Sequence, residues 1–121
     1  MDPIPMHEYG IVRALLDRVE AEAHAHRATA VRSVQLRIGE LSGVEPELLG
    51  FAFEAFAGGT MCANARLQVS SVPARWECPA CATEVARDGA LRCPACGGAA
   101  RLAAGGEIIL ERLELEVPDV S

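Results

Sequence analysis

The sequence contains no lysine, because all 11 of its basic residues are arginines. Enzymes that form a Schiff base through a side-chain amine need a lysine, and so do nucleotide-binding loops of the Gly-x-x-x-x-Gly-Lys type. The sequence therefore excludes both classes of protein.

Long apolar runs are missing as well, although half of the residues are apolar. No stretch reaches the roughly 18 apolar residues of a membrane-spanning helix, and the N-terminus lacks the basic-then-apolar order of a secretory signal. We therefore expect no membrane partner and a cytoplasmic protein, in a compartment that keeps metal-binding cysteines reduced. A length of 121 residues fits one compact domain, or one domain with a small inserted module.

A Cys-Pro-Ala-Cys tetrapeptide occurs twice, at residues 78–81 and 93–96. Two such turns are typical of a zinc ribbon, in which each turn supplies two sulfurs to one tetrahedral ion. A rubredoxin-like iron site uses similar turns and stays open as an alternative, whereas a thioredoxin-like redox motif would be a single copy opening a helix. The remaining cysteine, Cys62, is expected to be a small buried apolar residue.

Five segments outside the cysteine region show the spacing of regular structure. Apolar residues every three or four positions predict helices, and Pro46 suits the first position of the second helix. Alternating apolar and polar residues predict strands. The predicted elements are a helix over 7–27, a strand over 33–38, a helix over 46–57, a strand over 65–72 and a strand over 108–117.

This order predicts an α+β fold: a small three-stranded sheet with two helices, and an inserted zinc-ribbon module with four cysteine ligands. The last strand must return to the first domain, because three strands bury far more apolar surface than two. We therefore assign residues 1–74 and 105–121 to one domain and residues 75–104 to the ribbon. A ribbon of about thirty residues has little apolar core, so we expect it to need its metal to fold.

The N-terminal Met-His-Glu-Tyr of residues 6–9, with this order of elements and the paired cysteine motifs, resembles the HypA family of hydrogenase nickel-incorporation proteins. Segments 36–42, 51–54 and 113–116 also look like landmarks of that family. The resemblance implies a metallochaperone rather than an enzyme, with Ni²⁺ in the two-helix domain and structural Zn²⁺ in the ribbon. It implies the maturation GTPase HypB and the large subunit of [NiFe]-hydrogenase as partners, and urease maturation proteins for some family members.

The resemblance also implies ligands, residue by residue. His7 would be the imidazole ligand of nickel, and Glu8 would contribute its backbone nitrogen and its carboxylate. Met6 and Glu45 complete the candidate nickel set, although a carboxylate before Pro46 also simply favours a helix N-terminus. Ni²⁺ favours nitrogen donors, with carboxylates and water in six-coordinate sites. The implied zinc ligands are Cys78, Cys81, Cys93 and Cys96.

The chain departs from the family pattern at its N-terminus. The motif methionine is normally the first residue and its α-amine binds nickel, whereas Met6 follows five other residues here. Its nitrogen is therefore an amide, unless the protein starts at Met6 or the leader is removed. With the leader in place we expect nickel binding that is weaker or differently coordinated.

A different class stays open, namely a zinc-ribbon module that binds nucleic acid or another protein without transferring nickel. A net charge of −6, with Trp76 as the single aromatic residue of the ribbon, opposes nucleic-acid binding, and we expect no such partner. His24 and His26 offer a second imidazole pair, but positions i and i+2 lie on different sides of a helix. The sequence leaves the choice between monomer and homodimer open.

Overall fold

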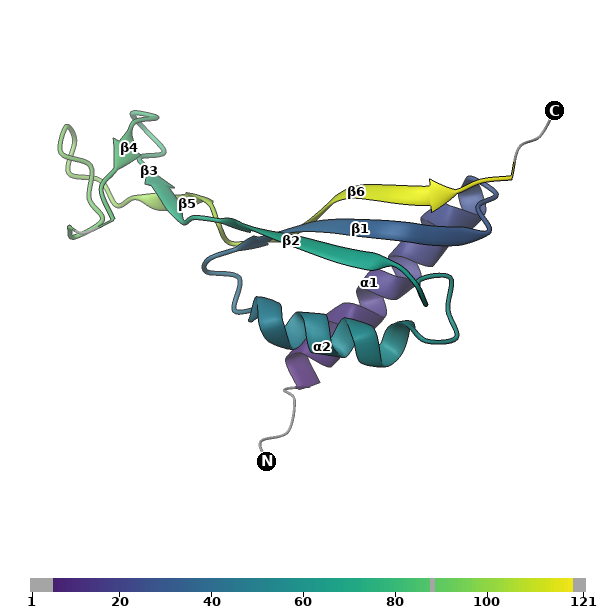
Figure 1. Cartoon of the computed structure of the whole chain (residues 1–121). Helices are drawn as coiled ribbons and strands as arrows, with labels where there is room; N and C mark the ends of the chain where they lie inside the picture. The colour runs from purple at the N-terminus through teal and green to yellow at the C-terminus, as the bar shows by residue number, and fades with distance from the viewer. Residues whose placement is uncertain (1–5, 88, 119–121) are drawn as a thin grey trace.

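The computed structural model describes residues 6–87 and 89–118, with the backbone alone for Met6 and His7. The predicted α+β fold is confirmed, and Figure 1 shows a helix-and-sheet body from one end of which a smaller sheet extends. The elements of the described residues are α1 (Met6–Ala25), β1 (Ala30–Gly39), α2 (Pro46–Ala57), β2 (Arg66–Val72), β3 (Arg75–Glu77), β4 (Glu84–Val85), β5 (Arg101–Ala104) and β6 (Ile108–Glu116).

Helix α1 buries the apolar stripe that its sequence predicts. The buried residues of this stripe are Val12, Leu16, Val19 and Ala23. The helix ends where the Ala28 N–H donates to the Ala23 carbonyl at 2.9 Å. Arg27 allows this bond by adopting a left-handed conformation with φ 57°.

The main sheet has the order β2-β1-β6, with β1 parallel to β2 and antiparallel to β6. A parallel pair needs a crossover connection, and α2 supplies it between β1 and β2. Both helices lie on the same face of the sheet (Figure 1). The last strand therefore returns to the first part of the chain, as predicted, and makes β1 the central strand.

The core lies between the helices and the covered face of the sheet. Leu36 of β1 and Leu49 and Phe53 of α2 are almost inaccessible to solvent. Phe56, which helical spacing predicts to be buried with them, is only half-buried, and its ring meets Tyr9 edge-on at a centroid distance of 4.9 Å. Phe56 therefore lies at the margin of the core, packed against it but partly exposed.

Closely packed backbone joins the main sheet to the cysteine segment, which is the ribbon of residues 75–104. A Cβ at Gly39 would collide with the backbone of Gly105, which itself has φ +93° and lies against Ala74. The Glu40 N–H donates to the Val72 carbonyl, and the Leu41 N–H to that of Gly105, both at 2.8 Å. The end of β1 thus holds both chain crossings that lead to and from the cysteine segment.

The cysteine segment contains a second sheet with the order β4-β3-β5, which hydrophobic spacing did not predict. These strands are two to four residues long, too short to show an alternating pattern. The buried residues of the whole cysteine segment are Cys78, Val85 and Cys93, with Trp76 and Ala100 partly buried against them. Within the described ranges, no helix combines the length and apolar character needed to cross a membrane.

Candidate metal centres

The two Cys-Pro-Ala-Cys motifs fold into turns with the same hydrogen-bond pattern. The Cys78 N–H donates to the Thr83 carbonyl at 2.9 Å, and the Ala82 N–H donates to the Cys78 carbonyl at 2.8 Å. Cys93 makes the equivalent pair of bonds with Gly97 and Gly98, both at 2.8 Å. The fourth residue after each leading cysteine has a left-handed backbone: Ala82 has φ 58° and Gly97 has φ 73°. The tetrapeptide repeat in the sequence is thus a structural repeat.

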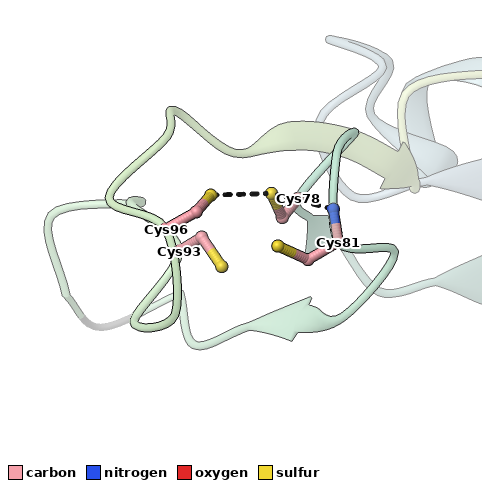
Figure 2. A group of neighbouring side chains, drawn as sticks. All are labelled: Cys78, Cys81, Cys93 and Cys96. Carbon is pink, nitrogen blue, oxygen red and sulfur yellow. Dashed lines mark hydrogen bonds between the residues drawn. The ribbon is translucent and has the colours of Figure 1, made fainter.

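The two turns face each other and bring four sulfur atoms to one point (Figure 2). All four Sγ atoms lie within 4.8 Å of one another, and those of Cys78 and Cys96 are 3.6 Å apart. Zinc–sulfur bonds of about 2.3 Å in a tetrahedron place sulfurs about 3.8 Å apart. The cluster therefore fits a four-thiolate ion such as zinc. Its four residues are Cys78, Cys81, Cys93 and Cys96.

The backbone and the neighbouring thiols act oppositely on the acidity of the cluster. Hydrogen bonds from the Cys96 and Ala95 N–H groups lower the pKa of Cys93 to about 6. Hydrogen bonding among the sulfurs, chiefly with Cys96, raises the pKa of Cys81 to about 12. A cluster without metal therefore retains protons, which a bound cation must displace.

Polar groups around the sulfurs are also arranged to support thiolates. The Cys81 N–H donates to the Cys78 sulfur at 3.4 Å, and the Gly98 N–H donates to the Cys96 sulfur at the same distance. The Thr83 hydroxyl lies 3.8 Å from the Cys93 sulfur. Sequence reasoning missed this supporting role of Thr83 and Gly98. The sequence nevertheless contains a signal for this role, because both residues stand five positions after the first cysteine of a motif.

The nickel candidates lie at the N-terminal ends of the two helices. The side chains of Met6 and His7 fall outside the described residues, so the structure locates only their backbone, in the first turn of α1. Glu8 is buried, and its Oε1 accepts a hydrogen bond from the Glu45 N–H at 3.4 Å. Glu45 is the N-cap residue of α2, and its own carboxylate makes no capping bond. The structure thus brings together Glu8 and Glu45, which are 37 positions apart.

Among the side chains that the structure describes, no second group of three or more metal-ligating residues occurs. His26 lies 3.9 Å from Glu22 on the exposed surface of α1, and among the described residues neither His24 nor His26 belongs to a group of metal-ligating side chains. Cys62 is inaccessible to solvent within the main core, where burial and then the Glu20 carboxylate raise its pKa to about 11. Its predicted place as a small buried apolar residue is confirmed.

Comparison with known sequences finds one family across nearly the whole chain. Residues 6–115 match the family described as "Hydrogenase/urease nickel incorporation, metallochaperone, hypA". A Hydrogenase maturation factor HypA from Shewanella oneidensis is 41% identical over 113 residues, covering 92% of this chain and 96% of the relative. One from Streptomyces avermitilis is 46% identical over 97 residues, covering 78% of this chain and 74% of the relative.

Solved structures show the same similarity. The solution structure of the Ni metallochaperone HypA from Helicobacter pylori superimposes with a TM-score of 0.72 at 26% identity, covering 92% of this chain and 98% of that one. A second solution structure of a HypA protein superimposes with a TM-score of 0.79 at 27% identity, covering 94% and 99% of the two chains.

Proposed function

Since the chain belongs to the HypA family of hydrogenase/urease nickel-incorporation metallochaperones, we propose that it binds Ni²⁺ beside the N-terminus of α1 and delivers it during [NiFe]-hydrogenase maturation. The receiving partners would be a HypB-type GTPase and the hydrogenase large subunit, with urease maturation proteins as further clients. In this proposal the delivery of nickel takes place in the cytoplasm, and the protein catalyses no reaction. Residues 1–74 and 105–121 form the nickel domain in this proposal, and residues 75–104 form the ribbon.

The contact between Glu8 and the backbone of Glu45 is the observation that carries the nickel assignment. It connects the first turn of α1, which includes His7, to the backbone of Glu45, whose side chain is exposed. An imidazole and a carboxylate from two different elements are donors that Ni²⁺ accepts. His7, Glu8, Glu45 and Met6 are therefore the proposed nickel set.

The helix terminus explains how backbone nitrogens can take part. The first four N–H groups of an α-helix lie outside its ladder of backbone hydrogen bonds, and the first turn of α1 contains His7 and Glu8. Nickel can therefore replace these amide protons without breaking the hydrogen-bond ladder of α1. Because this turn is at the end of the element, a partner can remove the cation without disturbing the core.

The cysteine cluster has a separate, structural role in the proposal. Bound there, zinc would supply a closed four-thiolate anchor that leaves no open position for chemistry. Cys78 and Cys93 would hold it from the buried side, and Cys81 and Cys96 from the exposed side. The ribbon would then present a rigid surface to partners, separate from the nickel ligands.

Nickel titration of the zinc-loaded protein by calorimetry tests the assignment. We expect His7→Ala to abolish the tight nickel site, because nickel loses its imidazole ligand, while zinc content and the amide NMR spectrum stay unchanged. His24→Ala is the matched control, since it removes an exposed α1 imidazole away from Glu8. Equal nickel affinity in the two variants would contradict the proposal.

A further inference from the structure

The face of the main sheet that the helices leave open carries polar residues in register across all three strands. Ser33 of β1 pairs with Arg66 of β2 on one side and with Glu114 of β6 on the other. Residues paired across strands point to the same face of a sheet. A guanidinium, a hydroxyl and a carboxylate therefore stand in one row on the open face.

A β-bulge adds a second arginine to this row. The register between β1 and β6 shifts between Val31 and Ser33, which leaves Arg32 as the extra residue. A bulge sets two residues of one strand against one of its partner and re-aims their side chains. Arg32 consequently borders the same pocket as Ser33. This pocket has a volume of about 280 Å³ and is lined by Arg32, Ser33, Asn64, Arg66, Gln68 and Glu114.

The groups that line the pocket have unused hydrogen-bonding capacity. Ser33 is only 7% exposed, and its hydroxyl has no hydrogen-bond partner in the described part of the chain. Buried polar groups are nearly always paired, so an unpaired one indicates a missing partner. Among the ion pairs of residues 8–87 and 89–118, none includes Arg32 or Arg66.

We propose that this pocket binds the C-terminal carboxylate of a peptide. The guanidinium groups of Arg32 and Arg66 match a carboxylate in shape and charge, and the Ser33 hydroxyl donates to it. Glu114 discriminates among anions, because it repels a dianion such as phosphate but accepts a hydrogen bond from the amide N–H next to a chain-terminal carboxylate. The pocket is small for a cofactor but large enough for one terminal residue. The site does not depend on nickel transfer.

NMR titration of the ¹⁵N-labelled, zinc-loaded full chain tests the proposal, with N-acetylglycine, acetate and inorganic phosphate at constant ionic strength. N-acetylglycine carries a carboxylate and an adjacent N–H, acetate carries the carboxylate alone, and inorganic phosphate, kept on the alkaline side of its second pKa, is mainly the dianion. We expect saturating shifts at residues 32–33, 64–68 and 114, with affinity decreasing from N-acetylglycine to acetate to phosphate.

Variants identify the groups responsible. Arg66→Gln should lower the affinity for N-acetylglycine about tenfold, because it removes a charge-assisted hydrogen bond. Ser33→Ala should lower this affinity less and leave the fold intact. Glu114→Gln should reduce the preference for N-acetylglycine over acetate. Arg37→Gln, an exposed arginine of β1 outside the pocket, is the control and should bind as the unmodified protein does. Equal effects of Arg37→Gln and Arg66→Gln, shifts that never saturate, or tighter binding of phosphate would overturn the proposal.

Discussion

At the scale of single residues, Glu8 has a structural part besides the one its position in the motif implies. Its buried carboxylate accepts the N–H of Glu45 and so connects the starts of the two helices. An N–H at the start of a helix lacks an intrahelical partner, and a carboxylate is a favourable acceptor there. Substitution of Glu8 should therefore disturb the helix pair as well as nickel binding, which makes His7 the cleaner residue to test.

The nitrogen of Met6 provides a second prediction at this scale. A chain shortened to begin at Met6 has an α-amine at the motif, and we expect it to bind nickel at least about tenfold more tightly than the full chain, equivalent to about 1.4 kcal/mol. An amine offers a lone pair near neutral pH, whereas an amide must first lose its proton. Calorimetric nickel titration of both chains measures the difference. The substitution His7→Ala, made in both chains, should remove this difference in affinity. Equal nickel affinity of the two unsubstituted chains would show that the amine is not a ligand.

At the scale of elements, the two cysteine turns can be compared with each other. Gly97 and Ala82 occupy equivalent left-handed positions, and a Cβ at Gly97 would meet no atom within 4 Å. Gly97→Ala should therefore cost only the backbone strain, about 1 kcal/mol, which is roughly a fivefold loss of zinc affinity. Ala82→Gly should change the affinity little or raise it. Competition with a zinc chelator measures both, and a loss of affinity in Ala82→Gly as large as in Gly97→Ala would contradict this explanation.

One carboxylate adds side-chain bonds to the backbone contacts that join the main sheet and the ribbon. Glu40, which follows β1, accepts the Ala74 N–H at 2.9 Å and pairs with Arg87 of the ribbon at 2.7 Å. The Arg87 hydrogen bond and then that of Ala74 lower the pKa of Glu40. We expect Glu40→Gln to loosen the orientation of the ribbon, measured by residual dipolar couplings. Arg101→Gln is the control, because its partner Glu77 lies within the ribbon sheet.

The pH dependence of this connection follows from the direction of the shift. A carboxylate whose pKa is lower in the folded protein contributes stability above its ordinary pKa and loses it as the pH falls through the folded value. The ordinary value is 4.5 for Glu40. The difference in ribbon orientation between the unmodified protein and Glu40→Gln should therefore be the same at pH 7 and at pH 6. A difference that disappears between these two values would mean that another group controls the orientation.

The sequence predicts local features of these elements better than contacts between them. The cysteine cluster follows from spacing, because a Cys-x-x-Cys turn closes within a few residues. The pairing of Glu8 with Glu45 and of Glu40 with Arg87 depends on how the helices and the ribbon pack, which no spacing encodes. The short strands of the ribbon were missed because hydrogen bonds beside the metal turns, rather than an apolar face, determine them.

At the scale of the whole molecule, the two sheets differ in how they are stabilised. The main sheet packs on a continuous apolar core with two helices, whereas the buried residues of the ribbon are Cys78, Val85 and Cys93. We expect removal of zinc by a chelator to bring amide signals of residues 75–104 to random-coil positions. Signals of 8–72 and 108–116 should keep their dispersion in ¹⁵N NMR spectra. Loss of dispersion throughout would show that the main core also depends on the metal.

The position of β6 also determines the order in which the protein can assemble during its synthesis. Because β6 (Ile108–Glu116) is translated after the ribbon, one side of β1 stays unpaired until the ribbon has been synthesised. All four cysteines of the cluster precede β6, so they can leave the ribosome and take up metal before the main sheet closes. Metal supply would then act early in biosynthesis, on a nascent chain whose main sheet still lacks its last strand.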